Sequence, residues 1–442
     1  MYSVEALRTL WLIHKFTKEK ESELMESYKN IQFVSDEFLC NSCGACAAVC
    51  PTDAIDFKEN RAGYFFARVD ADKCIDCEIC IGVCSGLGMH PSVLDKLPSN
   101  PFVGQIEKSL AGYSTDDDIY NNSQSGGIVT AVLANQLRTG KIDGVIQVKM
   151  ASGMRPRAKA FIATSAEELK NGQKSKYCPV PILTLFKELN KCEGKYAFAG
   201  TACQLHGLLN ILERYPKYKD KLAFSIGLFC ESVLTYKAVD YLLKRSHIQG
   251  SIEDFAFKDK SISPYPGDVM LKNDKGEIRT LPSKKRIWIK DLLTPLRCRL
   301  CFDKLNVLAD ISVGDPHGIA SLNKTNGESL VLIRTSKGAE LMEDLRASGE
   351  AAFHEVDMNS ALKGQLIETK KQDWLSFSNS WFKMDKRMPD FYTKVAASIQ
   401  QNYKPKDYRL ELYCATNAKG PFVDILIIMG LIRKKFIKMF SL

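Results

Sequence analysis

Two cysteine-rich segments near the N-terminus constrain this chain more than any other feature of its sequence. The first reads CNSCGACAAVCP over residues 40–51, and the second reads CIDCEICIGVC over residues 74–84. The cysteines in both are separated by two, two and three residues, so the second segment repeats the first. Such short intervals let successive thiolates converge on a compact inorganic group, while the fourth cysteine departs on a short helix. The sequence therefore predicts that this region folds around bound metal.

The spacing is that of bacterial ferredoxins, in which the fourth cysteine of each motif serves the other cluster of a pair. The predicted ligand sets therefore cross over. One 4Fe–4S cluster would be held by Cys40, Cys43, Cys46 and Cys84, and the other by Cys74, Cys77, Cys80 and Cys50. Ser85 stands where the first motif has Pro51, a change that affects the local turn and not a ligand.

Zinc and disulfides are the alternative explanations for so many cysteines. Paired Cys-x2-Cys segments can build a tetrahedral zinc site, but two copies of a three-plus-one spacing fit zinc poorly. Disulfides form in oxidising compartments, and the N-terminus lacks the arrangement of a secretory signal. The 15 cysteines of the chain, mostly in metal-ligand spacings, indicate a reducing cytoplasm instead. Two ferredoxin-type clusters are the favoured interpretation.

Length and charge narrow the remaining functions. The 442 residues are 45% hydrophobic, which is ample for a sizeable core in two or three domains. The net charge of +9 is a mild excess over this length. It is compatible with an acidic redox partner, a phosphorylated cofactor or an anionic membrane surface. The chain shows no basic stripe with interleaved aromatic residues, so nucleic acid is not an expected partner.

Four regions are predicted along the chain. Residues 1–35 form an N-terminal helix and linker, and residues 36–95 form the two-cluster domain. Residues 105–350 form a larger domain, and residues 351–442 form a helical region that ends in a basic, apolar tail. The apolar run of that tail is too short to span a bilayer. An interfacial helix is one interpretation of it, and a terminal helix packed on the protein is the favoured one.

Residues 105–350 are predicted to form an α/β domain with a mixed, partly parallel sheet, because strand-like and helix-like runs alternate there. The fold class is therefore α+β, a small ferredoxin-like module followed by a larger α/β domain. Strands are predicted at residues 142–150, 158–165, 195–200, 221–230, 309–315 and 329–335, and helices at residues 128–137, 204–215 and 336–349. In sheets of this kind, ligands gather at the carboxyl ends of the strands.

Four further cysteines lie where a ligand is expected. Cys203 follows one predicted strand at the start of a helix, and Cys230 ends the next strand. Cys298 and Cys301 form a Cys-x2-Cys loop shortly before the strand at residues 309–315. A lone cysteine at a strand end is most often simply buried, but the joint pattern predicts a third cluster. The four sulfurs are expected to form one compact group that opens toward Ser125, Gly126 and Gly127. The remaining cysteines are interpreted as ordinary ones that lie well apart from this group: Cys178, Cys192 and Cys414.

Six segments of the chain match the motifs of a known family, in the family's order. They read SQSGGIVTAVL (123–133), KSKYCPV (174–180), AGTACQLHGL (199–208), IGLFC (226–230), CRLC (298–301) and ADISVGD (309–315). The chain thus resembles the coenzyme F-420 hydrogenase/dehydrogenase beta subunits, which are iron–sulfur flavoproteins. Ala202 replaces the proline that usually precedes the cysteine of the third motif, which loosens the turn but keeps the thiol. The resemblance implies FAD in the α/β domain, a further 4Fe–4S cluster close to it, and electron exchange between the clusters and a hydride-accepting flavin.

Two of these motifs supply candidate flavin-binding residues. Ser125, Gly126 and Gly127 precede a predicted helix, where glycines let backbone amides approach an anion and the helix dipole favours it. Taken alone, this segment is more often a simple turn. Lys174 and Lys176 would meet a diphosphate or the electron-rich edge of a reduced flavin, and solvated surface positions are the alternative.

The candidate catalytic residues are Lys176 and Asp315. Asp315 ends a predicted strand near the expected crevice of cluster and cofactor, and a capping carboxylate is the alternative interpretation. His206 and His317 are the histidines nearest these motifs and are considered for proton transfer.

Together these features predict an iron–sulfur, flavin-dependent oxidoreductase. It would pass electrons between 4Fe–4S clusters and FAD, to or from a hydride-carrying cofactor or a biosynthetic intermediate. A flavin suits this position because it exchanges electrons singly or in pairs. The alternative is a non-catalytic electron-transfer subunit that links ferredoxin to a partner enzyme. Expected partners are a redox protein such as ferredoxin or a partner subunit, and a small-molecule hydride carrier or substrate. The protein is predicted to be cytoplasmic, with peripheral membrane contact of the C-terminal tail left open.

Overall fold

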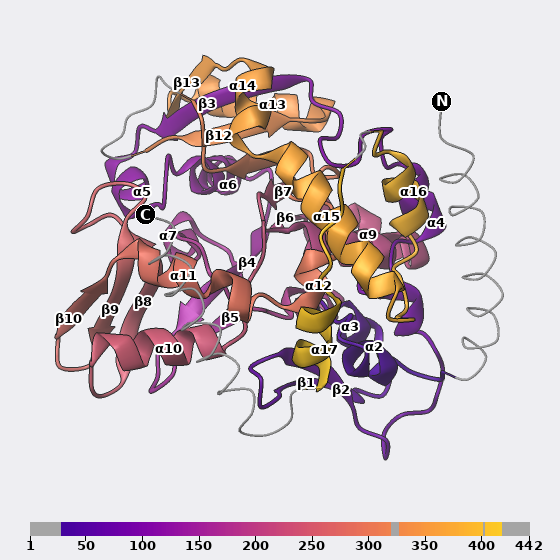
Figure 1. The fold of residues 1–442 in the computed structure, drawn as a ribbon. Coiled ribbons are helices and arrows are strands. Elements are labelled where there is room, and N and C mark those ends of the chain that lie inside the picture. The colour runs from indigo at the N-terminus through magenta and orange to yellow at the C-terminus, as the bar shows by residue number, and fades with distance from the viewer. Residues whose placement is uncertain (1–27, 320–326, 401–402, 418–442) are drawn as a thin grey trace.

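The computed structural model describes residues 28–319, 327–400 and 403–417 (Figure 1). Most of the predicted N-terminal helix and the basic, apolar tail at residues 421–442 lie outside these ranges. Among the helices that are described, none has the length and apolar character needed to cross a membrane.

The two cysteine motifs form a small ferredoxin-like region, as predicted. Helix α3 (Ala45–Val49) lies within the first motif, and the short 3-10 helix η1 (Ile81–Val83) lies at the same place in the second. Strands β1 (Ile55–Glu59) and β2 (Phe65–Val69) run between the motifs and pair antiparallel. Two short helices flank the region, α2 (Gln32–Asp36) before it and α4 (Pro91–Asp95) after it.

The larger region is built on a mixed sheet whose eight described strands follow the order β13-β3-β12-β11-β7-β6-β4-β5. These strands are β3 (Lys108–Ser114), β4 (Gly144–Ala151), β5 (Arg157–Ala163), β6 (Tyr196–Thr201), β7 (Leu222–Leu228), β11 (Ile311–Gly314), β12 (Ser329–Ile333) and β13 (Ala351–Glu355). The four central strands β4, β6, β7 and β11 are mutually parallel, and the outer strands pair antiparallel. The predicted α+β fold class with a mixed, partly parallel sheet is confirmed.

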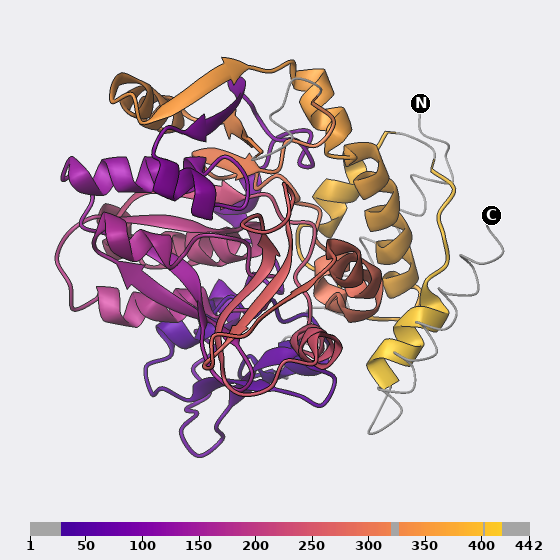
Figure 2. The same ribbon diagram turned by 90° about the vertical axis from the view of Figure 1, so that its left-hand side faces the viewer.

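Helices cover both faces of this sheet (Figures 1 and 2). Successive residues of a strand point to opposite faces, so β6 contributes Ala197 to one apolar cluster and Phe198 to another. The first cluster contains α6 (Ile128–Arg138) and α13 (Ser336–Ala347), and the second contains α9 (Ala202–Arg214). The predicted helices on these three segments are therefore confirmed.

The ferredoxin-like region packs directly against α9. Ala45 of α3 and Val83 of η1 share an apolar cluster with Leu205 and Leu208 of α9. Because this contact is made by buried side chains of both regions, the cysteine loops are held against the large sheet instead of being carried on a free module.

A second sheet of three antiparallel strands was not predicted from the sequence. It contains β8 (Ile252–Asp259), β9 (Asp268–Asn273) and β10 (Ile278–Leu281), in the order β10-β9-β8. Helices α10 (Lys237–Ser246) and α11 (Ser283–Leu293) flank it. The signal in the sequence was weak, because β8 reads IEDFAFKD, a run of three apolar residues between charged pairs that does not alternate with a period of two.

The C-terminal part of the described chain is mostly helical. Strand β13 still belongs to the large sheet, so that sheet extends past residue 350, where the sequence placed the domain boundary. The helices that follow are α14 (Met358–Gly364), α15 (Ile367–Phe382), α16 (Tyr392–Ala397) and α17 (Arg409–Asn417). The remaining short helices are α5 (Asp117–Asn122), α7 (Ala166–Lys170), η2 (Ile182–Leu185), α8 (Phe186–Leu189), η3 (Pro216–Lys221) and α12 (Leu296–Arg299).

Candidate functional site

The thiols of Cys40, Cys43, Cys46 and Cys84 come together in the ferredoxin-like region. Burial raises the pKa of the Cys46 thiol, and the neighbouring charges of the other three raise it further. Burial and the charges of Cys43 and Cys40 raise the pKa of Cys84 in the same way. These four cysteines are the set that the crossover of the two motifs predicts, so the fold brings them together as expected.

Ser85, which replaces the proline of the first motif, has a specific contact in this set. Its hydroxyl donates to the sulfur of Cys43 at 3.4 Å and accepts a hydrogen bond from the side-chain amide of Asn41 at 3.0 Å. Ser85 is only 1% exposed. Hydrogen bonds to sulfur are one of the ways in which a protein adjusts an iron–sulfur cluster. The substitution therefore exchanges a turn-forming residue for a hydrogen-bond donor to a candidate ligand.

The thiols of the second set line one cavity near the surface: Cys50, Cys74, Cys77 and Cys80. Cys77 is exposed, whereas Cys80 is buried. Burial and the charges of Cys77 and Cys50 raise the pKa of Cys80 to about 11. The second set is therefore also assembled across the two motifs, and it lies closer to solvent than the first.

The spacing of these thiols bears on the zinc alternative. Within the described ranges, no three or more His, Cys, Asp or Glu side chains lie close enough together to hold a single metal ion. A zinc ion draws its sulfur ligands to about 2.3 Å, whereas a 4Fe–4S cluster keeps its four thiolates farther apart around a larger core. Each set offers four thiols drawn from both motifs, which is the ligand arrangement of a pair of 4Fe–4S clusters.

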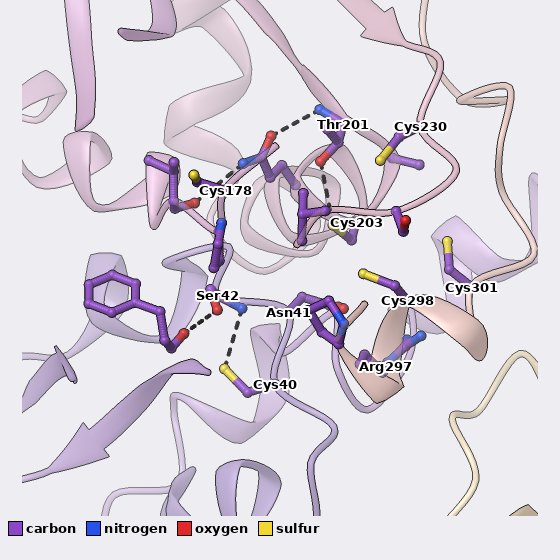
Figure 3. Close-up of a pocket in the computed structure, with 18 of the residues that line it drawn as sticks. Cys40, Asn41, Ser42, Cys178, Thr201, Cys203, Cys230, Arg297, Cys298 and Cys301 are labelled. Atoms are coloured by element: carbon purple, nitrogen blue, oxygen red, sulfur yellow. Dashed lines mark hydrogen bonds between the residues drawn. The ribbon is translucent and has the colours of Figure 1, made fainter. Parts of the chain in front are cut away.

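The four scattered cysteines of the α/β domain also meet. Cys203, in the first turn of α9, and Cys230, just after β7, line one cavity together with Cys298 and Cys301 (Figure 3). Burial raises the pKa of the Cys230 thiol, and the charges of the other three thiols raise it further. The empty space between the atoms that line this cavity, counted with the open solvent at its mouth, is about 710 Å³. The predicted convergence of these four residues is observed.

The start of α9 explains how Ala202 can replace the usual proline. Ala202 is the first helical residue, a position that proline favours because its fixed φ suits the helix start. Here a capping box does the same work. The side chain of Thr201 and the side chain of Gln204 bond reciprocally to the backbone of the first turn, the Thr201 amide donating to Gln204 Oε1 at 2.9 Å. The turn that presents Cys203 is therefore held without the proline.

Two expectations about this cavity differ from the structure. Cys178 was expected to lie well apart from the four cysteines, but it lines the same cavity, across from Cys230 in Figure 3. The cavity was also expected to open toward Ser125, Gly126 and Gly127, and none of these residues lines it. Cys192 lies elsewhere and donates to the carbonyl of Glu188, and the side chain of Cys414 lies outside the described part of the structure.

The cavity is bordered by the ferredoxin-like region as well. Cys40, Ser42 and Phe65 form part of its wall. Arg297, which precedes Cys298 and is 3% exposed, donates to the backbone carbonyls of Gly86 at 3.1 Å and Ser85 at 3.0 Å. The loop that carries two of the scattered cysteines is thus fastened to the second ferredoxin motif.

His206 and Asp303 fix the same loop from the other side. The ring of His206 is 2.9 Å from Asp303 Oδ2, and Asp303 is fully buried. Asp303 also accepts a hydrogen bond from the amide of Val307 at 3.0 Å. These contacts give His206 a structural role next to the cysteine loop.

The glycines proposed as a phosphate cradle have packing partners in the chain itself. A Cβ added at Gly126 would lie 2.2 Å from the carbonyl oxygen of Gly112, so glycine is required there for close packing. The Gly126 amide donates to the Ser329 hydroxyl at 3.1 Å and is not free for a phosphate. Gly127 has a φ of +79° and caps α6, and Ser125 lies within hydrogen-bond distance of Ser329.

The two lysines of the second motif are engaged inside the protein and are not solvated surface residues. Lys174 forms an ion pair with the buried carboxylate of Asp259. The ammonium of Lys176 donates to the backbone carbonyls of Gly172 and Gln173. Burial, with a smaller contribution from the charge of Lys174, lowers the pKa of Lys176 to about 7.

Asp315 lies directly after β11, at the carboxyl end of that strand, as predicted. It pairs with the largely buried Lys258 of β8 at 2.7 Å and accepts hydrogen bonds from the amide of Gln124 at 3.1 and 3.2 Å. Gln124 in turn accepts a hydrogen bond from the backbone amide of Ser175 at 3.2 Å. Asp315 therefore connects the first, second and last of the six motifs.

Sequence reasoning missed three cations at this place. Lys258 lies near the end of β8, Lys260 follows that strand directly, and Arg286 comes from α11. Lys260 donates to the carbonyl of Ser125 at 2.8 Å, and burial lowers its pKa to about 8. Arg286 is 8% exposed, lies over the ring of Tyr177, and has no hydrogen-bond partner for its Nε among the described residues. No local motif marks these residues. They come together only through the small sheet and the helix α11 beside it, whose arrangement depends on contacts between distant parts of the chain.

We call this group the cationic site. It contains more positive than negative side chains: Lys174, Lys176, Lys258, Lys260 and Arg286, against Asp254, Asp259 and Asp315. Largely buried charges of one sign are costly unless a ligand or a partner of opposite charge compensates them. The described residues alone do not supply enough negative charge, so the site suits an anionic ligand.

A short chain of contacts joins the cationic site to the cysteine cavity. The side chain of Gln365 donates to the backbone carbonyl of Asp315 at 2.7 Å, and Lys304 donates to the carbonyl of Gln365 at 2.6 Å. Lys304 also pairs with Glu231 at 3.2 Å, and Glu231 follows Cys230. The two sites are therefore neighbours, although they do not share one cavity wall.

Two adjoining family models now identify the chain. The model for the N-terminal part of the coenzyme F-420 hydrogenase/dehydrogenase beta subunit matches residues 109–187, and the model for its C terminus matches residues 193–359. Together they span more than half of the chain. The chain belongs to this family. A 4Fe–4S dicluster domain matches residues 39–85, which contain the eight cysteines of both ferredoxin motifs. This beta-subunit relative is therefore an iron–sulfur protein.

Several known proteins resemble this family member over much of its length. An uncharacterized protein of Methanocaldococcus jannaschii is 28% identical over 384 residues, 79% of this chain and 98% of that protein. The coenzyme F-420 hydrogenase subunit beta of Methanosarcina barkeri is 29% identical over 261 residues, 57% of this chain and 82% of that protein. A subunit of the F(420)H(2) dehydrogenase of Methanosarcina mazei is 25% identical over 348 residues, 76% of this chain and 90% of that protein.

A solved structure confirms the fold of the larger region. A chain of the F-420-reducing [NiFe] hydrogenase complex from Methanosarcina barkeri superposes with a TM-score of 0.51 and 23% identity. The superposition covers 66% of this chain and 98% of that chain. The family's fold is thus retained here, with additional residues in this chain outside the superposed part.

Proposed function

We propose that this beta-subunit relative is an iron–sulfur flavoprotein oxidoreductase. It would pass electrons between three 4Fe–4S clusters and FAD, to or from a hydride-carrying cofactor or a biosynthetic intermediate. The observation that carries the proposal is the meeting of Cys203, Cys230, Cys298 and Cys301 in one cavity whose wall also includes Cys40.

The twelve clustered thiols would hold the three clusters. The first ferredoxin-type cluster would use Cys40, Cys43, Cys46 and Cys84, the second Cys50, Cys74, Cys77 and Cys80, and the third Cys203, Cys230, Cys298 and Cys301. The fit is chemical as well as geometric, because each set offers four thiols, the number of ligands that a 4Fe–4S cluster takes. Burial raises the pKa of these thiols, so their thiolate forms are costly without a compensating positive charge. The iron of a bound cluster would supply that positive charge.

The cationic site would hold FAD. Its excess of positive charge fits a diphosphate, and the Nε of the buried Arg286, which has no hydrogen-bond partner among the described residues, offers a hydrogen bond to an anionic oxygen. Bound FAD exchanges electrons singly or in pairs, which joins one-electron clusters to a two-electron hydride carrier. We propose Ser125, Gly126, Gly127, Lys174 and Lys176 as residues around this cofactor, with Gly126 acting through packing.

Lys176 and Asp315 are the proposed catalytic residues. A lysine with a pKa of about 7 is able to hold or release a proton near neutral pH. Asp315 is held in place by Lys258 and by the amide of Gln124, so its carboxylate keeps a fixed orientation toward the cationic site. Asp315 would orient the cofactor, and Lys176 would donate or accept the proton that accompanies hydride transfer.

The positions of the three thiol sets support an order of electron transfer. The second set lies nearest solvent at Cys77, the first set shares a wall with the third, and the third adjoins the cationic site. A redox partner, either ferredoxin or a partner subunit, would therefore exchange electrons at the second set. The hydride carrier would exchange electrons at the opposite end of this order, at the cationic site.

A non-catalytic electron-transfer subunit is the second candidate function. The relatives in the two Methanosarcina species are both named as subunits of larger enzymes. In that case this chain would pass electrons from ferredoxin to a partner enzyme and would not itself react with a hydride carrier.

Anaerobic purification of the single chain, with iron, sulfide and flavin measured on one sample, tests the proposal. Three clusters require about 12 iron atoms per chain. Asp315→Asn and Lys258→Met should lower the flavin content with the iron content unchanged. Lys272→Met, at a half-exposed lysine of β9 paired with Glu253, is the matched control. A chain that purifies with full iron and no flavin, and that fails to oxidise or reduce a hydride carrier, would establish the electron-transfer subunit instead.

A further inference from the structure

Helix α15 (Ile367–Phe382) begins after residue 359, where the family match ends, and it packs on the loop of Cys298 and Cys301. The indole nitrogen of Trp374 donates to the carbonyl of Leu300 at 2.9 Å, inside that loop. Trp374 is 1% exposed, so this hydrogen bond is sealed from water. The helix therefore forms part of the support for the third set of thiols.

Lys370 lies one turn before Trp374 and on the same face of α15. It is 7% exposed, and its ammonium is 3.3 Å from Glu231 Oε1, next to Cys230. Its charge also interacts with the thiols of Cys301 and Cys298. A buried ammonium thus pairs with a carboxylate and interacts electrostatically with the thiols of Cys298 and Cys301, whose sulfurs are drawn in Figure 3.

The carboxylate of Glu231 does not by itself neutralise the positive charges around the third set of thiols. Lys304 pairs with its second oxygen at 3.2 Å, so one carboxylate serves two ammonium groups. Arg297 adds a third cation. Its guanidinium donates to the backbone carbonyls of Gly86 and Ser85, so these hydrogen bonds do not pair it with a carboxylate. Asp303, the other nearby carboxylate, is occupied by His206 and by the amide of Val307. The surroundings of the third set therefore carry net positive charge.

A 4Fe–4S cluster on four thiolates becomes more negative by one charge when it is reduced. Positive charge fixed nearby stabilises the reduced form, and its effect is strong where water is excluded. We propose that α15 completes the third cluster site and that Lys370 raises the reduction potential of the cluster bound there. Lys370 is a positioning and tuning residue and not a ligand. The inference rests on the proposed function, because it requires the third cluster.

Redox titration of the reconstituted full chain, followed by electron paramagnetic resonance, tests this inference. Lys370→Met should shift the midpoint potential of the third cluster to more negative values, and Lys370→Arg should keep it close to that of the wild type. Lys371→Met is the matched control, because it removes the same charge from the adjacent residue, which pairs with the exposed Glu368. It should leave the potential unchanged. Loss of the third cluster in the methionine variant but not in the arginine variant would also support a role for the charge.

Three outcomes would overturn the inference. An unchanged potential in Lys370→Met at full iron content would show that the ammonium does not act on the cluster. Loss of the cluster in both the methionine and the arginine variants would assign Lys370 a packing role only. A wild-type chain with only about eight iron atoms would remove the third cluster, and with it the proposed function as well as this inference.

Discussion

The sulfur of Cys43 lies against the backbone of Gly207, so that a Cβ added at Gly207 would be 3.1 Å from it. Gly207 is four residues after Cys203 in α9, and residues at this spacing share one face of a helix. One helical face therefore touches a thiol of the first ferredoxin set and carries a thiol of the third. The absence of a side chain at Gly207 is what lets the two sets approach each other.

Gly207→Ala should disturb the first ferredoxin set without unfolding the protein. The added methyl would also meet Leu183 at 3.0 Å, so neighbouring groups must move by a few tenths of an ångström. Alanine favours the helix by about 1 kcal/mol, which offsets part of a crowding cost of about 1–3 kcal/mol. We expect altered electron paramagnetic resonance signals of the ferredoxin pair. Gly276→Ala controls for a loss of stability away from the thiols, because its φ of +78° strains an alanine although nothing lies within 4 Å of the added Cβ. Identical spectra for wild type and Gly207→Ala would contradict the close approach.

Alanine at Cys43 or at Cys77 should each remove one cluster of the ferredoxin pair. The two residues belong to different crossover sets, one buried and one exposed. Each variant should lose about four iron atoms and retain its flavin, because the cationic site is built from other elements. Cys192→Ala, at a thiol that only donates to a backbone carbonyl, should retain all of its iron. Full iron content in Cys43→Ala or Cys77→Ala after anaerobic reconstitution would refute the crossover assignment.

Arg155 joins the ferredoxin-like region to the α/β domain. Its guanidinium donates to Glu59 of β1 and to Asp240 of α10, each at 2.8 Å. Arg155→Met would leave two carboxylates short of a partner, and we expect a loss of about 2 kcal/mol in the free energy of unfolding. Limited proteolysis should then cut the ferredoxin-like region more readily. Arg138→Met, which breaks the more exposed pair with Glu350, should cost less than about 1 kcal/mol. Equal losses in both variants would argue against a linking role for Arg155.

The stability of the protein should rise with pH above neutrality because of Lys176. Burial lowers its pKa to about 7 in the folded chain, whereas an unfolded lysine titrates near 10.5. Between these values the unfolded chain binds a proton that the folded chain does not, so unfolding becomes less favourable as pH rises. The contribution is at most about 1.4 kcal/mol per pH unit. Lys176→Met should flatten the dependence of the thermal midpoint on pH between 7 and about 9. Lys159→Met, at an exposed lysine of β5, should keep the wild-type slope, and a wild-type slope in Lys176→Met would contradict the assignment.

The sequence by itself determined the features that depend on neighbours along the chain. The two-two-three spacing places four thiols within a few residues, and because this spacing is typical of bacterial ferredoxins, the crossover of the two sets was predictable. The strands and helices of the α/β domain follow from hydrophobic periods of two and of about 3.6 residues, and the α+β class followed from their order. The positions of Cys203 and Cys230 at strand ends were readable for the same reason.

Only the tertiary structure decided which distant residues share a site. Strand order across the sheet brings Cys203, Cys230, Cys298 and Cys301 into one cavity, and it also sets Cys178 on the wall of that cavity. Lys258 of β8 reaches Asp315, and Arg286 of α11 lies over the Tyr177 ring that Lys258 also faces. Lys370 interacts with the thiols because α15 packs on their loop. Local periodicity carries no information on these contacts. The burial, charge and free space around each side chain are set by residues far away in the sequence, and these surroundings bring separate cysteines and lysines together into sites.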